Sequence, residues 1–171
     1  LRLNPNVAET HVWYSIKLTT EGRFAEGIKH AERAVELDAQ TPFNQHNLGW
    51  VLYYARQFDR SLRQYQKTAE LFPGYPLAHY GLAWVLRYLG RYEEAVEHAN
   101  RAQELMNETV FSLHVQAQTF AAAGMREQAD KTGGAGAQVS VFAKRQRIRL
   151  AVIGVLPTED DQRAGMVYGQ R

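Results

Sequence analysis

The sequence predicts an all-α protein in which antiparallel helix pairs of equal length stack side by side, followed by an irregular C-terminal tail. Three observations predict this fold class. The sequence repeats at an interval of 34 residues, large apolar residues recur at helical spacing inside each repeat, and small residues recur where two helices would meet. One helix pair alone cannot bury its apolar face, so we expect consecutive pairs to pack against each other and form a continuous core.

The repeat interval is visible in four short, similar stretches. They begin with "LRLNPN" at residue 1 and continue with "VELDAQ", "AELFPG" and "QELMNE", each 34 residues after the last. When the sequence is aligned on this interval, three columns contain only small residues. They are Ser15, Gly49, Ala83 and Ala117; Gly27, Ser61, Ala95 and Ala129; and Ala34, Thr68 and Ala102. A helix backbone can approach its neighbour closely only where the side chains are small, so these columns predict helix contacts.

Apolar spacing and glycine positions divide each repeat into two helices. In the repeat that spans residues 42–75, apolar residues such as Leu48 and Leu52 follow the three- and four-residue spacing of an amphipathic helix. A left-handed backbone conformation ends a helix and favours glycine, and one column between the two helices holds Gly22, Gly90 and Gly124. The expected helices cover residues 8–20, 24–37, 42–55, 58–71, 76–89, 92–105 and 109–123, and an eighth begins near residue 126.

The register divides the chain into an array and a tail. The array covers residues 1–132: the end of a truncated repeat (1–7), the repeats 8–41, 42–75 and 76–109, and a partial repeat (110–132). Because the chain begins with Leu rather than Met, we expect it to be a piece of a longer protein. The tail, residues 133–171, loses the register and joins a basic run to an apolar run. Three interpretations stay open: a capping helix at about 139–153, a strand or disordered segment, and an out-of-frame read at the end of a gene fragment.

Composition and charge argue against several classes of protein. The chain has 171 residues, a net charge of +2 and no cysteine. The cysteine count excludes a disulfide framework and a cysteine nucleophile, and the low net charge disfavours a general nucleic-acid binder. No apolar run reaches the roughly 18 residues of a transmembrane helix, and no signal peptide is visible. We therefore expect a cytoplasmic protein with no membrane partner.

The chemistry-bearing residues do not form a catalytic or metal-binding pattern. Histidines in one column, such as His46 and His114, lie two repeats apart, whereas zinc ligands must lie about 2 Å from the metal. The glycine-rich segment "TGGAGAQ" (132–138) lacks the Lys and Ser/Thr that end a phosphate-binding loop. We expect no metal, no cofactor, no small-molecule substrate and no enzymatic activity.

The repeats resemble the tetratricopeptide repeat. The resemblance is carried by "NLGWVLYYARQFDRSLRQYQKTAELFP" (47–73) and "GLAWVLRYLGRYEEAVEHANRAQEL" (81–105), and it covers about residues 1–132. The sequence departs from the family where a Trp is common early in the first helix, because this column holds His11, Gln45, His79 and Leu113. The resemblance implies a right-handed superhelix, a TPR-like α-solenoid, with a concave groove lined by the first helix of each pair. It also implies binding of peptides or proteins.

With the family geometry, aromatic side chains of the middle two repeats line the groove. The predicted groove residues are His46, Trp50, Tyr53, Tyr54, Tyr80, Trp84, Arg87, Tyr88 and His114. Tyr and Trp offer a large contact area with few rotors to freeze. As an alternative, part of these aromatics only fill the seam between neighbouring first helices. Some family members clamp a terminal carboxylate with Lys, Asn and Arg, and this set is incomplete here, since only Asn47 and Arg87 are present.

These features predict a protein–protein interaction module, a scaffold or adaptor that binds a peptide or partner segment in an aromatic-lined groove. Two alternatives remain. The chain is a regulatory or sensory segment of a larger enzyme or transcriptional regulator whose other domain lies outside this sequence, or it is a self-association module that forms a homo-oligomer.

Overall fold

The described part of the chain is helical throughout, apart from short turns. The computed structural model describes residues 7–106, 110–125, 127–129 and 131–132, all within one compact unit that spans Leu1–Gly136. These residues contain no strand, so the predicted all-α class is confirmed. The predicted tail, residues 133–171, lies outside the described residues. The helices are α1 (Ala8–Thr20), α2 (Phe24–Leu37), α3 (Pro42–Tyr54), α4 (Phe58–Leu71), α5 (Pro76–Tyr88), α6 (Tyr92–Met106) and α7 (Val110–Ala122).

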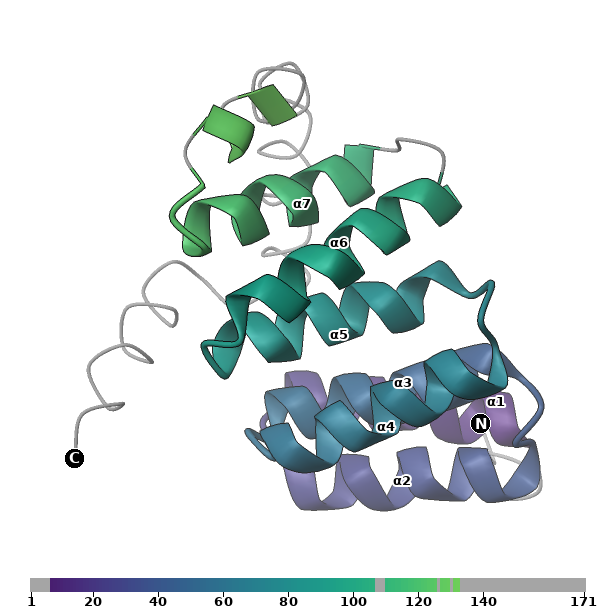
Figure 1. Cartoon of the computed structure of the whole chain (residues 1–171). Helices are drawn as coiled ribbons and strands as arrows, with labels where there is room; N and C mark the ends of the chain where they lie inside the picture. The colour runs from purple at the N-terminus through teal and green to yellow at the C-terminus, as the bar shows by residue number, and fades with distance from the viewer. Residues whose placement is uncertain (1–6, 107–109, 126, 130, 133–171) are drawn as a thin grey trace. The chain divides into compact units, whose positions relative to one another are not determined.

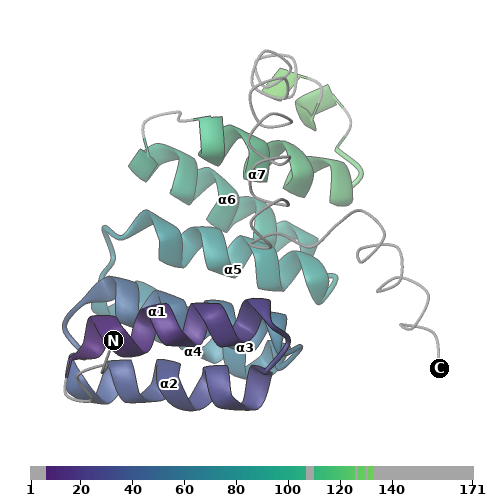
Figure 2. The same ribbon diagram turned by 180° about the vertical axis from the view of Figure 1, so that it is seen from behind.

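Consecutive helices form antiparallel pairs, which Figures 1 and 2 show from opposite sides. We call α1–α2 the first hairpin, α3–α4 the second hairpin and α5–α6 the third hairpin. In the second hairpin, Gln45 near the start of α3 contacts Gln64 of α4, whereas Gly49 further along α3 contacts Ser61. Because later residues of α3 meet earlier residues of α4, the two helices run in opposite directions.

Each first helix also packs beside the first helix of the next hairpin. Helix α1 contacts α3, α3 contacts α5, and α5 contacts α7. Asn47 of α3 donates a hydrogen bond from Nδ2 to Ser15 Oγ of α1 at 2.7 Å, and the rings of Tyr53 and Trp84 join α3 to α5. The described helices therefore form the stacked array of an α-solenoid, as the 34-residue register predicts.

Residues with special backbone geometry set the ends of the helices. Pro42 and Pro76 occupy the first positions of α3 and α5, where their missing N–H leaves no helical bond unmade. The predicted glycine column adopts the left-handed conformation at the end of α1, α5 and α7, with φ of 75° at Gly22, Gly90 and Gly124. In the second hairpin, Arg56 stands in the same column with φ of 59°. The turn therefore keeps its shape even where the sequence lacks glycine.

The small-residue columns lie where the helices cross, as predicted. Ser15, Gly49 and Ala83 are buried on the first helices. A Cβ at Gly27 would lie 2.8 Å from Thr19 Oγ1, so α2 approaches α1 more closely than any side chain would allow. Ser61 donates a hydrogen bond to the carbonyl oxygen of Gly49 at 2.8 Å and closes the same crossing in the second hairpin.

Candidate protein-binding surfaces

Six predicted groove residues form one aromatic surface on α3 and α5. We define this aromatic surface as Trp50, Tyr53 and Tyr54 of α3 with Tyr80, Trp84 and Tyr88 of α5. The rings of Tyr53 and Trp84 stack with centroids 5.4 Å apart and an interplanar angle of 23°, which joins the two helices. Trp50 lies against Tyr54 at 4.6 Å, and Tyr80 lies against Trp84 at 4.8 Å. Rings at these separations attract one another, so the surface is held in place before any partner binds.

Exposure differs strongly along the aromatic surface. Tyr88 is 47% exposed, Tyr80 is only 6% exposed, and the other four rings are half-buried. Part of each half-buried ring therefore faces its neighbours and part remains open to solvent. Tyr80 packs against Trp84 and fills the space between helices. This residue therefore fits the alternative interpretation, in which an aromatic ring only fills the seam between neighbouring first helices.

The buried phenol groups of the aromatic surface stay protonated. Burial raises the pKa of Tyr54 to about 12, with a smaller contribution from neighbouring Tyr53. Burial also raises the pKa of Tyr53 and, further still, that of Tyr80. The hydroxyls of Tyr53 and Tyr54 therefore keep their protons at physiological pH and can act as hydrogen-bond donors.

Arg87 places a positive charge at the edge of the aromatic surface. Its guanidinium donates a hydrogen bond from Nη1 to Gln118 Oε1 of α7 at 3.0 Å. Burial lowers the pKa of Arg87, and the nearby Tyr53 and Tyr80 oppose that shift. None of the ion pairs in the described part of the chain includes Arg87, so a partly buried cation stands beside the rings without a carboxylate to neutralise it.

The two predicted groove histidines do not join the aromatic surface. The His46 ring lies between Phe43, Tyr65 and Tyr75, with ring centroids 6.1, 5.5 and 6.2 Å away, and its Nδ1 is buried without a hydrogen-bond partner. Burial lowers the pKa of His46 to about 4, so the ring is neutral at physiological pH. His114 belongs to α7, but its side chain lies outside the described residues.

The first hairpin lacks this aromatic surface. At the positions of α1 that correspond to the surface, Val12 and Thr19 are buried, Ile16 is half-buried and Thr20 is exposed. Helix α1 instead exposes Trp13, 59% of which is open to solvent, beside a hollow of about 310 Å³. The matching residues, Asn47 of α3 and Gly81 of α5, are buried. Trp13 therefore lies on the side of α1 that corresponds to the side on which α3 and α5 meet the preceding hairpin.

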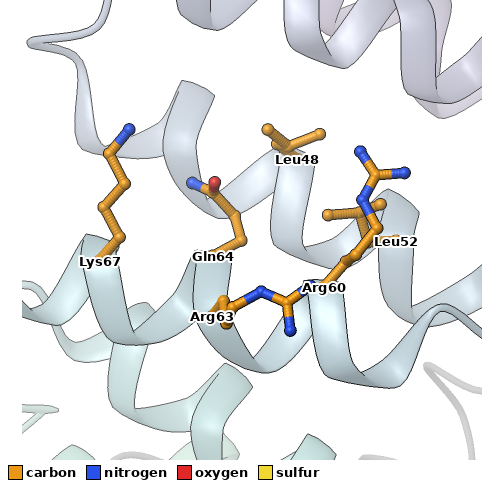
Figure 3. A pocket seen from close by; sticks show the side chains of 6 residues that line it. All are labelled: Leu48, Leu52, Arg60, Arg63, Gln64 and Lys67. Carbon is orange, nitrogen blue, oxygen red and sulfur yellow. The ribbon is translucent and has the colours of Figure 1, made fainter.

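A second hollow with a different lining lies on the second hairpin. This cationic cavity, shown in Figure 3, has a volume of about 220 Å³. It is lined by Leu48 and Leu52 of α3 and by Arg60, Arg63, Gln64 and Lys67 of α4. The sequence reasoning missed these residues because it compared the columns of the second helices for size and not for charge. Reading the column of Arg63 for charge would have revealed the change from Lys29 to Arg63 to Glu97.

The sequence reasoning also missed a polar contact that recurs inside every hairpin. The pairs are His11–His30, Gln45–Gln64 and His79–His98. The Nδ1 atoms lie 2.8 Å apart in the first histidine pair and 3.1 Å apart in the second, so one ring donates and the other accepts. Burial and the neighbouring ring lower the pKa of His30 and of His79. The equal separation of 19 residues within each pair is the signal that could have revealed them.

Neither a metal site nor a membrane span emerges from the described residues. No three His, Asp or Glu side chains among residues 7–106 and the described part of 110–132 come close enough together to hold a metal ion. No helix in the same part of the chain combines the length and apolarity needed to cross a bilayer.

Comparison with known proteins identifies the repeats. The tetratricopeptide repeat family matches residues 46–106, which cover most of the second and third hairpins. Residues 46–106 therefore carry tetratricopeptide repeats, and the helices on both sides of this segment follow the same 34-residue register. No curated protein matches the sequence significantly.

Several solved structures share this fold at low sequence identity. MamA is 18% identical, with a TM-score of 0.66 and 83% of each chain covered. The first TPR domain of human RPAP3 is 17% identical, with a TM-score of 0.64, and the match covers 74% of this chain and 99% of that domain. The first TPR of Spaghetti, bound to the HSP90 peptide SRMEEVD, is 16% identical with a TM-score of 0.61, and covers 72% of this chain and 98% of that one. At such identities the similarity establishes the fold.

Proposed function

We propose that the protein is an interaction module that holds a segment of a protein partner on the aromatic surface of α3 and α5. The observation that carries this proposal is the stack of Tyr53 on Trp84, with centroids 5.4 Å apart, because it makes one preorganised surface from two hairpins. Half-buried aromatic rings supply contact area at a small entropic cost, and such rings dominate the binding energy of many interfaces.

The polar groups around the rings support a peptide rather than a purely apolar ligand. The protonated hydroxyls of Tyr53 and Tyr54 can donate to main-chain carbonyl oxygens. Arg87 adds a fork of N–H donors that suits a carboxylate or a carbonyl of the bound segment. Because no carboxylate of the described residues neutralises Arg87, an acidic or carbonyl oxygen from the partner would complete its hydrogen bonding.

The structural relatives support the same class of ligand. The first TPR of Spaghetti, which has this fold, is bound to an HSP90 peptide. The present chain lacks the complete Lys, Asn and Arg set expected for clamping a terminal carboxylate. We therefore expect internal segments with apolar or aromatic anchors to bind better than segments that depend on a free C-terminus.

The test uses peptides selected by the full chain from a phage-displayed random library. The double variant Trp50→Ala/Trp84→Ala should bind the selected peptides at least about tenfold more weakly, because the two rings at the centre of the surface are removed. The matched control is Trp13→Ala, which removes an exposed Trp of α1 outside the aromatic surface and should leave the affinity unchanged. Affinity is measured by isothermal titration calorimetry, and helix content by circular dichroism.

Two outcomes would contradict the proposal. Equal affinity losses in the double variant and in Trp13→Ala would place the peptide outside the aromatic surface. A large loss of helical signal in the double variant would show that Trp50 and Trp84 serve the core. In that event the exposed Tyr88 provides a second probe, and an unchanged affinity in Tyr88→Ala would reject the surface.

A further inference from the structure

The polar pair inside each hairpin lies away from the turn that joins the two helices. In the third hairpin this turn contains Gly90, and the pair His79–His98 connects the first turn of α5 to the middle of α6. In the first hairpin, His11 and His30 occupy the corresponding positions of α1 and α2. Each pair therefore joins its helices where no covalent connection between them is near.

The two histidine pairs share one geometry. Their Nδ1 atoms lie 2.8 and 3.1 Å apart, and their rings stack with centroids 5.0 and 5.3 Å apart and interplanar angles of 29° and 28°. A hydrogen bond between two Nδ1 atoms needs a proton on one atom and a lone pair on the other. The contact is therefore lost when both Nδ1 atoms carry a proton.

The second hairpin makes the same contact without a titratable group. Gln64 donates from Nε2 to Gln45 Oε1 at 2.8 Å and to the carbonyl oxygen of Gln45 at 3.2 Å. A carboxamide keeps its donors and acceptors at every pH at which the protein folds. Histidine is therefore not required for this packing of two helices, and its presence in the first and third hairpins adds a dependence on pH.

The positions of the protons can be assigned in the third hairpin. The carbonyl oxygen of Pro73 accepts a hydrogen bond from the His79 ring. Because Nδ1 of His79 faces His98, the nitrogen that donates to Pro73 is Nε2. In the neutral pair, Nδ1 of His79 is then the acceptor and Nδ1 of His98 is the donor. The lone pair of neutral His98 is consequently on its Nε2 atom.

Added protons therefore bind to this pair in two steps with opposite consequences. The first proton binds to Nε2 of His98 and leaves the hydrogen bond between the Nδ1 atoms in place. Burial lowers the pKa of His98, and the carboxylates of Glu97 and Glu94 oppose that shift. The second proton has to bind to Nδ1 of His79 and breaks the hydrogen bond. Burial, charged His98 and the guanidinium of Arg101 all lower the pKa of His79.

The surroundings of the first hairpin lead to the same order. Burial and the charge of His11 lower the pKa of His30, and the carboxylate of Glu26 opposes that shift. The ring of Tyr14 lies edge-on to His30, with centroids 4.7 Å apart. Among the described residues, the charges that act on the two pairs come from the hairpins themselves and not from the helices packed beside them. In each pair, one charged ring thus opposes protonation of the other.

We propose that the two histidine pairs are acid-sensitive latches, which release the helices of the first and third hairpins when both rings of a pair are protonated. The glutamine pair keeps the second hairpin closed under the same conditions. In the third hairpin, release separates the part of α5 that carries Tyr80 from Ala99 and Ala102 of α6, which belong to one buried cluster. Acid therefore loosens two hairpins of the array and spares the hairpin between them.

The first experiment compares the full chain with His79→Gln/His98→Gln, which gives the third hairpin the residues of the second. Urea denaturation is measured at pH 7 and pH 4.5, with EDTA present. Because folding lowers the pKa of His79, the unfolded chain binds its proton first, and stability is lost as the pH falls below about 6.5. The urea midpoint should fall by at least about 0.3 M more in wild type than in the variant. His46 is present in both chains, so its contribution cancels.

A second experiment separates the latch from ordinary burial of single rings. Nitrogen-15 NMR follows the protonation of each ring in wild type, His98→Gln and His79→Gln. Since His79 binds its proton second, removing His98 should raise the pKa of His79, whereas removing His79 should change the pKa of His98 much less. Neutral His98 should show the chemical shifts of a ring protonated at Nδ1.

Each other outcome counts against the latches. Equal midpoint losses in wild type and in His79→Gln/His98→Gln would overturn the proposal, and so would a pKa of His79 that ignores His98→Gln. If the double variant has reduced helix content, Gln45→His/Gln64→His replaces it, because this change gives the second hairpin the pair of the third. Its midpoint should fall further between the two pH values than that of wild type, and an unchanged fall would reject the latch.

Discussion

The boundary between the first and second hairpins and the boundary between the second and third hairpins are filled in different ways. At the first boundary, Asn47 donates to Ser15 Oγ at 2.7 Å, and the adjoining residue of α2 is the small, fully buried Ala31. At the second boundary, the residues in the same columns are Gly81 and Tyr65. The buried ring of Tyr65 lies against Gly81, where an added Cβ would be 2.2 Å from the ring.

This difference shows that the side chains of two columns fill one shared space between neighbouring hairpins. A small residue on the second helix of one hairpin, Ala31, is combined with a medium-sized residue on the first helix of the next hairpin, Asn47. At the other boundary, the large ring of Tyr65 is combined with Gly81. The boundary before α7 follows the first solution, since Ala99 and Val115 are both buried there. Close packing requires the summed volume of the two side chains to stay about constant, whereas the volume of either side chain alone can vary.

The largest effect on stability is expected when Gly81, at the second boundary, is replaced by asparagine, the residue found in the same column at the first boundary. Gly81→Asn should lower the free energy of unfolding by about 3 kcal/mol or more, because its side chain must displace the enclosed ring of Tyr65. Adding Tyr65→Ala recreates the pair Ala31–Asn47, so the double variant should lose at least about 1 kcal/mol less than the sum of the single variants. Urea denaturation of the four chains measures this coupling.

A matched glycine provides the control for this cycle. Gly74 lies in an exposed turn with no atom within 4 Å of an added Cβ, so Gly74→Asn should change the stability by less than about 0.5 kcal/mol. Strict additivity of Gly81→Asn and Tyr65→Ala would show that the two columns do not share a volume.

An intermediate effect is expected from acid, which should weaken the second boundary. His46, in the column of Val12, has a pKa lowered to about 4 by burial, against about 6.5 for an unfolded chain. The unfolded state therefore binds the proton first, and the stabilisation present above about pH 6.5 is lost as the pH falls towards 4. Between about pH 7 and about pH 4.5, protonation of this one ring costs on the order of 2 kcal/mol.

The variant His46→Val tests this assignment by copying the first hairpin. Its stability should fall less between the two pH values than that of wild type, by about the same 2 kcal/mol, in urea denaturation at each pH. The pKa values of His30, His79 and His98 are also lowered, so some acid sensitivity should remain. An unchanged pH dependence in His46→Val would place the sensitivity in those paired rings instead.

The smallest effect is expected in the turns that close the hairpins. Arg56 adopts a φ of 59°, where the other hairpins have glycine, and its guanidinium donates to the Tyr88 hydroxyl at 2.7 Å. A residue with a Cβ is strained in the left-handed backbone conformation, and glycine is not, so Arg56→Gly should stabilise the protein by about 0.5 kcal/mol. Thermal denaturation measures this change. A loss of stability would show that the hydrogen bond to Tyr88 outweighs the strain.

The sequence register was sufficient to predict the helices, the turn glycines and the small residues at the crossings, since each depends on one column at a time. It was insufficient wherever two columns meet. The pairing of Tyr65 with Gly81, the histidine pairs and the burial of Tyr80 all depend on which side chain a neighbouring helix presents. The cationic cavity depends on charges in the second helices, where the 34-residue interval conserves size but leaves charge free to vary.

The positions of the three tryptophans give the molecule a built-in optical signal. Trp13 is exposed on α1, whereas Trp50 and Trp84 lie in the aromatic surface, and the chain has no other tryptophan. In a Trp13→Phe background, indole emission would come from the aromatic surface alone. A ligand seated there would shift the spectrum, so one label-free titration could report occupation of the aromatic surface.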